Sequence, residues 1–133
     1  MSTAGQLRIV LVTPETTLLD EPALSLRLPL YDGQIGILPG RTPLIGRLGY
    51  GELRIRTSAG ERSYYVDGGF LQVKGSVVSV LTNRAVPRDA IKAADAQEML
   101  QSALARVPTT DQDFAAKTRD QERARRMLQM TRS

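Results

Sequence analysis

The chain contains no cysteine and no histidine. Their absence removes the thiol nucleophile, the thiolate or imidazole metal site and the Ser-His-Asp arrangement of hydrolases. It also removes any disulfide framework and any side chain whose ordinary pKa lies near neutrality. A general base would have to be a strongly shifted carboxylate, lysine or tyrosine. These absences favour binding or coupling over catalysis, and we expect neither catalytic residues nor a metal site.

Long apolar runs are missing as well. The longest apolar stretches span only a few residues, far below the roughly 20 that cross a bilayer as a helix. The N-terminal segment Met1–Gln6 is short and polar, unlike a secretory signal. We therefore expect a soluble, intracellular chain. Its 133 residues, 41% of them hydrophobic, suffice for one compact domain, alone or with a short appendage.

Lysine is scarce, and arginine takes its place. Only Lys74, Lys92 and Lys117 are lysines among the eighteen basic residues, so fifteen are arginine, and the formal net charge is +4. Arginine suits bidentate pairing with carboxylates better than lysine does. The composition therefore directs attention to acidic partners.

The first two thirds of the chain predict β-structure. Short segments rich in branched residues alternate apolar and polar side chains and end at glycine, proline or aspartate. Two hairpins are expected, with turns at Ser58–Glu61 and Lys74–Ser76. Many short strands at such spacing predict an antiparallel β-sandwich. The predicted strands are 7–12, 25–28, 51–57, 62–66, 70–73 and 77–81.

The last third predicts helices, since no glycine follows Gly75 and alanine becomes frequent. The segment Pro108–Asp111 separates two helices, and Thr109, Thr110 or Asp111 can cap the second, expected over about 112–130. The first helix carries an apolar stripe at spacings of three and four, and the second a thinner one. The stripes are Ala93, Ala96, Leu100, Ala103, Leu104 and Val107, and Phe114, Ala124, Met127 and Leu128.

Two glycine-containing segments call for a functional reading. The stretch 31–40 lacks the lysine of a phosphate-binding loop, which favours turns over an anion site. Asp67-Gly68-Gly69 could present a catalytic carboxylate, but the sequence is also typical of a hairpin turn, which we predict here. The neighbouring Tyr64 and Tyr65 should point to opposite faces, one into the core and the other to the surface or an interface.

The arginines of the second predicted helix have three possible readings. The alternatives are a solvated face, a face that meets an acidic protein, and a nucleic-acid-binding surface, the last two as in a binding module with a basic helical tail. The few aromatics and the interspersed acidic residues argue against nucleic acid. A β-sandwich enzyme that uses a carboxylate is a further alternative, disfavoured because most Asp and Glu lie in predicted turns.

An ordered set of segments resembles a known family. Residues 32–44, Asp-Gly-Gln-Ile-Gly-Ile-Leu-Pro-Gly-Arg-Thr-Pro-Leu, are similar to the G-E-L-G-I-x-P-G-H-x-P-L segment of the epsilon subunit of bacterial F-type ATP synthase. Further similar segments follow in family order over about residues 7–86. They are Val12–Glu15 with Leu18–Asp20, Gly49–Ile55, Tyr65–Val73, and Val80–Thr82 with Ala85.

The resemblance implies a fold and a role. It implies a ten-stranded N-terminal sandwich over residues 1–86 that binds the rotor, followed by a two-helix hairpin over 87–133. Such a subunit is non-catalytic and sits peripherally on the cytoplasmic side of the bacterial inner membrane, with no membrane segment or nucleic acid partner. It binds the gamma subunit and the c-ring, and it couples proton-driven rotation to ATP synthesis in the alpha/beta hexamer.

The resemblance also implies contact residues. The loop 31–44 would face the c-ring and the base of gamma, through Tyr31, Asp32, Gln34, Ile37, Arg41, Thr42, Pro43 and Leu44. Gln34 stands where the family often has an acidic residue, and Arg41 stands where it often has histidine. In many members the helices extend and brake ATP hydrolysis, which would bring Arg119, Arg123, Arg125 and Arg126 to an acidic stretch of the beta subunit.

One family motif is altered. Some members bind ATP through I/L-D-x-x-R-A, whereas this chain has Ile91-Lys92-Ala93-Ala94-Asp95-Ala96. The motif's aspartate is replaced by Lys92 and its arginine by Asp95. We therefore expect no ATP site of that kind and no cofactor.

Overall fold

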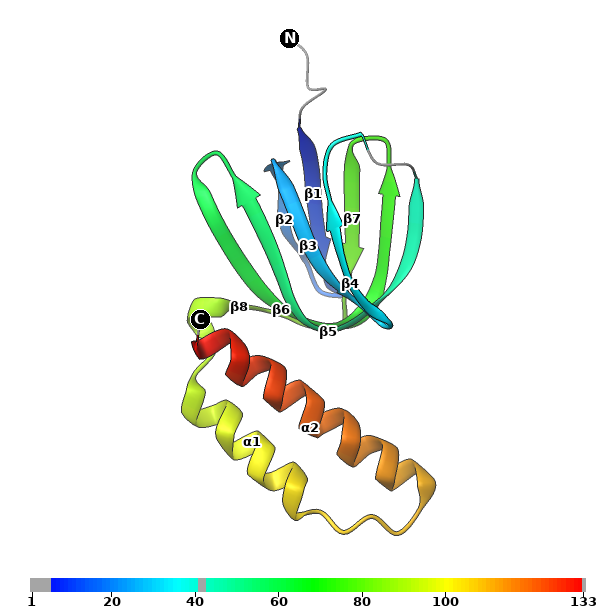
Figure 1. The fold of residues 1–133 in the computed structure, drawn as a ribbon, viewed down its shortest axis with the longest axis vertical. Coiled ribbons are helices and arrows are strands. Elements are labelled where there is room, and N and C mark those ends of the chain that lie inside the picture. The colour runs from blue at the N-terminus through cyan, green and yellow to red at the C-terminus, as the bar shows by residue number, and fades with distance from the viewer. Residues whose placement is uncertain (1–5, 41–42, 133) are drawn as a thin grey trace.

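Strands occupy the first two thirds of the chain and helices the last third in the computed structural model, which describes residues 6–40 and 43–132 (Figure 1). The strands are β1 (Leu7–Val12), β2 (Thr17–Ala23), β3 (Ser25–Leu30), β4 (Gly33–Ile37), β5 (Leu44–Thr57), β6 (Gly60–Lys74), β7 (Val77–Leu81) and β8 (Ala85–Pro87). A 3-10 turn, η1 (Arg88–Ala90), leads to α1 (Ala93–Ala105) and α2 (Asp111–Arg132).

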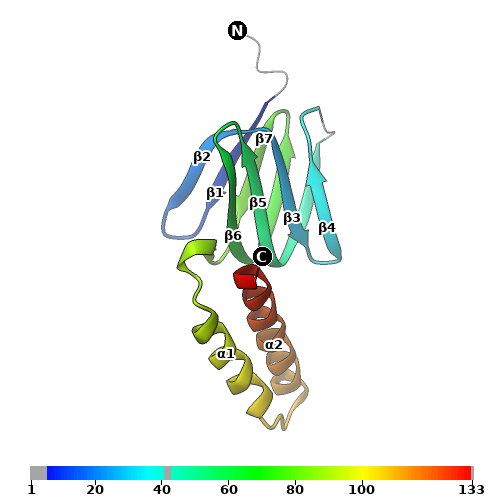
Figure 2. The ribbon, with the colours of Figure 1, turned by 60° about the vertical axis from the view of Figure 1, so that its left-hand side comes forward.

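The strands pair in the order β2-β1-β7-β6-β5-β3-β4, with β8 on β6. The long strands β5 and β6 curve from one layer into the other, and Figure 2 shows β7 behind β5 and β3. The expected ten strands appear as eight in the described residues, because β5 and β6 each run unbroken through both layers. The sheet is antiparallel, as expected, except that β1 and β7 pair in parallel. The long connection between those two strands permits this.

Alternating side chains of the strands fill the space between the layers. The sheet core comprises sixteen buried residues from β1–β7, with Leu30, Ile35, Leu44, Tyr64 and Ala85 packed against it. Both predicted hairpins are confirmed, since Thr57 pairs with Gly60 and Lys74 pairs with Val77. The sheet therefore has a core of its own, to which the helices contribute nothing.

The prediction of a hairpin turn at Asp67-Gly68-Gly69 is wrong. The segment lies inside β6, and β6 bends there with Gly68 at φ 71° and Gly69 at φ 114°. A Cβ on Gly69 would overlap the carbonyl oxygen of Leu81 on β7. Glycine is required because two backbones touch at a positive φ, not because the chain reverses.

The helices form an antiparallel hairpin attached to one end of the sandwich (Figure 1). A second core joins Tyr65 of β6 to the buried Ala96 of α1 and to Met127, Leu128 and Met130 of α2. Ala103 and Ala124 are buried as well, whereas Leu104, Val107 and Phe114 are exposed, which corrects those parts of the predicted stripes. Tyr64 and Tyr65 do face different cores, with Tyr65 fully buried and Tyr64 half-buried.

Candidate functional site

The segment expected to face the rotor is mostly strand in the structure. Tyr31 and Asp32 form the turn between β3 and β4, Gln34 lies on β4, and Leu44 begins β5. The β3–β4 turn lies at the helical end of the sandwich, whereas β4 ends and β5 begins at the opposite end (Figure 1). The predicted contact residues therefore form two separate surfaces instead of one loop.

The residues of this segment differ in their exposure to solvent. Tyr31, Asp32, Gln34 and Pro43 are exposed, and Leu44 is half-buried. Ile37 is fully buried in the sheet core opposite Leu26, so its assignment as a contact is corrected. The alternation of β4 turns it inward. Arg41 and Thr42 lie outside the described residues.

The end of the segment near the helices carries a cation–π pair. The guanidinium carbon of Arg47 on β5 lies 4.4 Å from the centroid of the Tyr31 ring. The backbone N–H of Tyr31 also donates to the carbonyl of Arg47 at 2.8 Å. These contacts hold an exposed aromatic ring in one orientation, which lowers the conformational entropy lost when a partner binds it.

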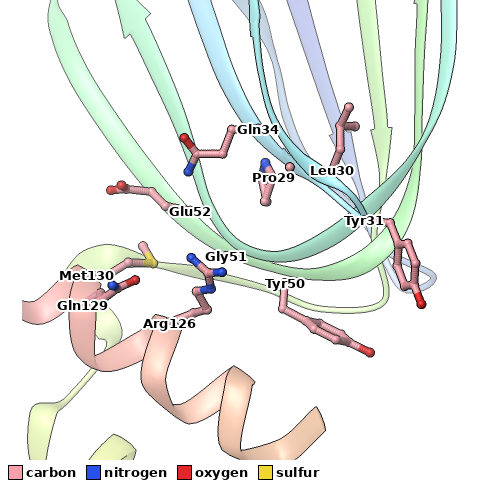
Figure 3. A pocket seen from close by; sticks show the side chains of 11 residues that line it. Pro29, Leu30, Tyr31, Gln34, Tyr50, Gly51, Glu52, Arg126, Gln129 and Met130 are labelled. Carbon is pink, nitrogen blue, oxygen red and sulfur yellow. The ribbon is translucent and has the colours of Figure 1, made fainter. Parts of the chain in front are cut away.

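One pocket brings together residues that were predicted for two different sites. A cavity of about 210 Å³ lies between the sandwich and α2, and its lining includes Tyr31 and Gln34 of the rotor segment and Arg126 of the helical hairpin. Figure 3 shows Arg126 rising from α2 beneath the strands that carry Gln34 and Glu52. The arginine thus occupies the sandwich–helix junction.

The four arginines predicted as inhibitory contacts differ in their surroundings. Arg126 pairs with Glu122 one turn earlier at 2.8 Å, an exposed pair on the surface of the helix. Arg119 lies 3.5 Å from Asp120, and Arg125 is exposed and makes no ion pair with any described residue. Arg123 differs from the other three because it is partly buried and forms an ion pair with a carboxylate of the sandwich.

Arg123 links β6, α2 and the end of α1. Its Nε donates to Oδ1 of Asp67 at 2.9 Å, and its Nη1 donates to Oδ1 of Asp120 at 3.1 Å. Nη1 of Arg106, which follows α1, donates to Oδ2 of the same Asp120 at 2.6 Å. The guanidinium also lies 4.8 Å from the ring centroid of Tyr50 on β5. We call Asp67, Arg106, Asp120 and Arg123 the Arg123 network.

The charges in this network stabilise one another. Burial lowers the pKa of Arg123, but the charge and hydrogen bond of Asp67, together with Tyr50 and Tyr65, raise it above the ordinary value. Partial burial likewise raises the pKa of Asp120, but the hydrogen bond and charge of Arg106, with Arg119 and Arg123 nearby, hold it below the usual range. Both groups therefore favour their charged forms in the folded hairpin.

Tyr65 lies beside the network and is fully buried. Burial raises the pKa of its hydroxyl, and the charge of Asp67 adds to the effect. The hydroxyl has no hydrogen-bond partner among the described residues. Tyr65 is thus a neutral group of the second core and has no role as a base.

An apolar surface that the sequence pattern did not predict lies on the outer face of β5, β6 and β7. Ile45, Phe70 and Leu81 are 76%, 62% and 50% exposed, and Phe70 pairs across the sheet with both Arg47 and Leu81. A groove of about 420 Å³ beside Phe70 and Leu81 extends to Pro14. Apolar and polar residues alternate along these strands, which indicates an apolar surface. Because apolar residues occur on both faces, however, the alternation does not show which face is the core.

Two kinds of site find no support among residues 6–40 and 43–132. No group of three or more acidic side chains there is arranged to hold a metal ion. None of the helices described is both long and apolar enough to cross a membrane. Lys92 precedes α1, and Asp95 lies in its first turn, so the positions of the altered nucleotide motif remain at the start of the helix.

Known proteins match both the sequence and the fold. Residues 6–88 match the family model of the ATP synthase delta/epsilon chain beta-sandwich domain. An ATP synthase epsilon chain of Rhodopirellula baltica is 45% identical over 126 residues, covering 95% of this chain and 98% of its own. One from a Synechococcus strain, JA-2-3B'a(2-13), is 35% identical and covers 92% and 91%.

Solved structures of lower identity share the fold. A chain in the mitochondrial ATP synthase of Euglena gracilis superposes with a TM-score of 0.86 at 22% identity, covering 96% of this chain and 82% of its own. A chain in the central stalk and c-ring structure of Tetrahymena thermophila gives 0.75 at 14% identity, with coverage of 98% and 99%. With the sequence matches over nearly the whole length, these findings show that the chain belongs to the ATP synthase epsilon family of non-catalytic subunits.

Proposed function

We propose that this chain is the central-stalk epsilon subunit of a bacterial ATP synthase, bound to gamma and the c-ring. In that position it helps couple ion-driven rotation to ATP synthesis in the alpha/beta hexamer. It reaches the cytoplasmic side of the inner membrane peripherally, through the complex. Residues 1–86 form the rotor-binding part, and residues 87–133 form a regulatory hairpin.

The apolar surface on β5, β6 and β7 carries this proposal. Exposed apolar patches on soluble proteins mark interaction sites, because leaving them in water forgoes hydrophobic stabilisation. Ile45, Phe70 and Leu81 lie on neighbouring strands of a rigid sheet, so binding needs little reorganisation. We assign this surface to gamma, and the exposed Tyr31, Asp32 and Gln34 at the helical end to the c-ring.

Co-purification with the other subunits tests the assignment. The wild-type chain should co-purify stoichiometrically with gamma and the alpha/beta hexamer, and Phe70→Glu should abolish this by placing a charge in the apolar contact. Val107→Glu is the matched control, since Val107 is 84% exposed in the connection between the helices. Normal assembly of Phe70→Glu would count against this docking face.

The same experiment extends to the rotor segment. Arg41→Glu reverses a charge in the segment that we assign to the base of gamma and the c-ring, and it should weaken association. Unchanged assembly of this variant would remove Arg41 from the contact.

We further propose that the hairpin brakes ATP hydrolysis through Arg119, Arg123, Arg125 and Arg126 when it reaches the alpha/beta hexamer. The exposure of three of these side chains supports the proposal, as does the dense positive charge of α2. Deleting residues from 109 onward should raise the ATPase activity of the assembled enzyme. Unchanged activity after deletion would refute the brake.

A further inference from the structure

We propose that the Arg123 network is a salt-sensitive latch that holds the helical hairpin against the sandwich. The basis is geometric, because one guanidinium contacts a carboxylate of the sandwich and a carboxylate of the hairpin at the same time. The latch itself is a property of the folded chain. Its consequence for regulation rests on the proposed braking function.

Asp67 is a prepared anchor on the sandwich side. Its backbone N–H lies 3.1 Å from both Thr82 Oγ1 and the carbonyl oxygen of Arg84, and Thr82 is itself almost fully buried. Asn83 donates a further bond to the Asp67 carbonyl. The bend of β6 at Gly68 and Gly69 follows immediately. The contacts with Thr82, Asn83 and Arg84 therefore fix the backbone of Asp67, whose carboxylate faces α2.

Arg123 is bound more extensively than its neighbours on α2. Its side chain is 27% exposed and that of Asp67 is 12% exposed, whereas the two members of the Arg126–Glu122 pair are 44% and 42% exposed. Partial burial strengthens a charge pair, since less water competes for it. Tyr50 covers the guanidinium from the β5 side.

The apolar docking surface of the hairpin is small, which makes the latch important. Met127, Leu128 and Met130 are the buried residues of α2 in the second core, and all lie near its end. Toward the connection between the helices, α2 carries exposed residues such as Phe114. The Arg123 network lies between these two regions. It attaches α2 to the sandwich one helical turn before the first buried methionine, Met127.

The latch gives Arg123 two mutually exclusive states. In the folded hairpin its Nε donates to Asp67 and its Nη1 donates to Asp120, so these two donors are not available to a carboxylate of another subunit. Release of the hairpin exposes this arginine at the same moment. Docking to the sandwich and contact with an acidic partner therefore compete for one side chain.

Native-state thiol labelling measures release directly, because the chain has no cysteine of its own. A cysteine in place of the buried Ala124, next to Arg123, reports exposure of the packed face of α2, and a cysteine in place of the buried Val80 of β7 reports opening of the sandwich. Asp67→Asn in the full chain should speed labelling at position 124 at least about tenfold, as expected for losing a hydrogen bond between charged groups. The rate at position 80 should not change.

Two further measurements isolate the ion pairs. Raising the salt concentration from 0.05 M to 0.5 M should speed labelling at position 124 in the wild-type background more than in Asp67→Asn. Arg123→Gln should behave like Asp67→Asn, and adding both changes should cost little more than either alone. Arg125→Gln removes the same charge from an exposed arginine of the same helix that has no ion pair within the described part of the chain, and it should leave the rate unchanged.

The outcomes separate the latch from the brake. Equal labelling of Asp67→Asn and wild type at position 124, or equal acceleration at positions 124 and 80, would overturn the latch. If labelling accelerates as expected but the ATPase activity of the assembled enzyme does not respond to deletion of the hairpin, the latch is supported and the braking function is overturned.

Discussion

Replacing Gly69 by alanine tests the reasoning about the bend of β6. Two costs are expected. A non-glycine residue at φ 114° costs about 1–3 kcal/mol in backbone strain. The new Cβ would also overlap Leu81 O and lie 2.9 Å from Thr82 Cα, and forcing these backbone atoms apart costs about another 1–3 kcal/mol.

Both costs fall on contacts that position the Arg123 network. Leu81 pairs with Phe70 in the ladder, and Thr82 accepts the N–H of Asp67. A total of about 2–6 kcal/mol is a large part of the roughly 5–15 kcal/mol that stabilises an ordinary domain. We therefore expect Gly69→Ala to lower the urea midpoint by about 1 M or more. Circular dichroism suits the measurement because the chain has no tryptophan.

Three other glycines separate the two costs. A Cβ on Gly49 would lie 2.6 Å from Leu30 O without a positive φ, so Gly49→Ala measures the clash. Gly75 has φ 61° and open space, so Gly75→Ala measures the strain. Gly36 has neither, and Gly36→Ala should unfold like the wild type or slightly later. If Gly69→Ala is no less stable than Gly36→Ala, the account of the bend is refuted.

Three smaller effects follow from the contacts of single side chains. Thr110→Ala should destabilise the chain by about 1 kcal/mol in urea unfolding, since Thr110 Oγ1 caps α2 by accepting the N–H of Asp113; a change below 0.2 kcal/mol would exclude the cap. Because the pKa of Asp120 is lowered on folding, its charge stabilises the folded state above the ordinary value of 3.8, and this stabilisation is lost as the pH falls through the folded value. Labelling at position 124 relative to position 80 should therefore rise below about pH 4, and less so in Asp120→Asn. Asp20→Asn should change the unfolding free energy by less than about 1 kcal/mol, because its pair with Arg8 is exposed; a larger loss would show that surface pairs matter here.

Local signals in the sequence were sufficient for most of the fold. The hairpins at Thr57–Gly60 and Lys74–Val77 join neighbouring segments, so turn residues and alternation specify them. The two helices likewise follow from composition and from the break at Pro108, and α2 begins within one residue of the expected position. These elements depend on contacts close in sequence.

The wrong predictions concern residues whose surroundings are determined by a segment distant in the sequence. Asp-Gly-Gly is typical of a turn, but the backbone of Leu81 passes over Gly69 and makes glycine necessary within a strand. Phe114 continues the periodic stripe of α2 but is exposed. The first turns of α2 extend away from the sandwich (Figure 1). In each case the local pattern is present in the sequence, but the contacts of the residue depend on segments that are not its neighbours in the sequence.

The contacts of the candidate site likewise depend on residues that are distant in the sequence. Arg123 was singled out with three other arginines as a member of a charged face. Its partner Asp67 stands 56 residues earlier, and no spacing rule connects the two. Ile37 was assigned to a contact surface from its place in a segment, while the pairing of β4 with β3 turns it into the core.

The position of the buried residues on α2 has a mechanical consequence. The helix is anchored near its C-terminal end, at Met127, Leu128 and Met130, and Phe114 lies thirteen residues before the first of these. At 1.5 Å per residue this makes a lever arm of about 20 Å. A modest force on the tip of the hairpin therefore produces a large torque on a small anchor and favours release of the hairpin from the sandwich. A partner that grips the tip gains mechanical advantage, whereas one that presses on the anchor end does not.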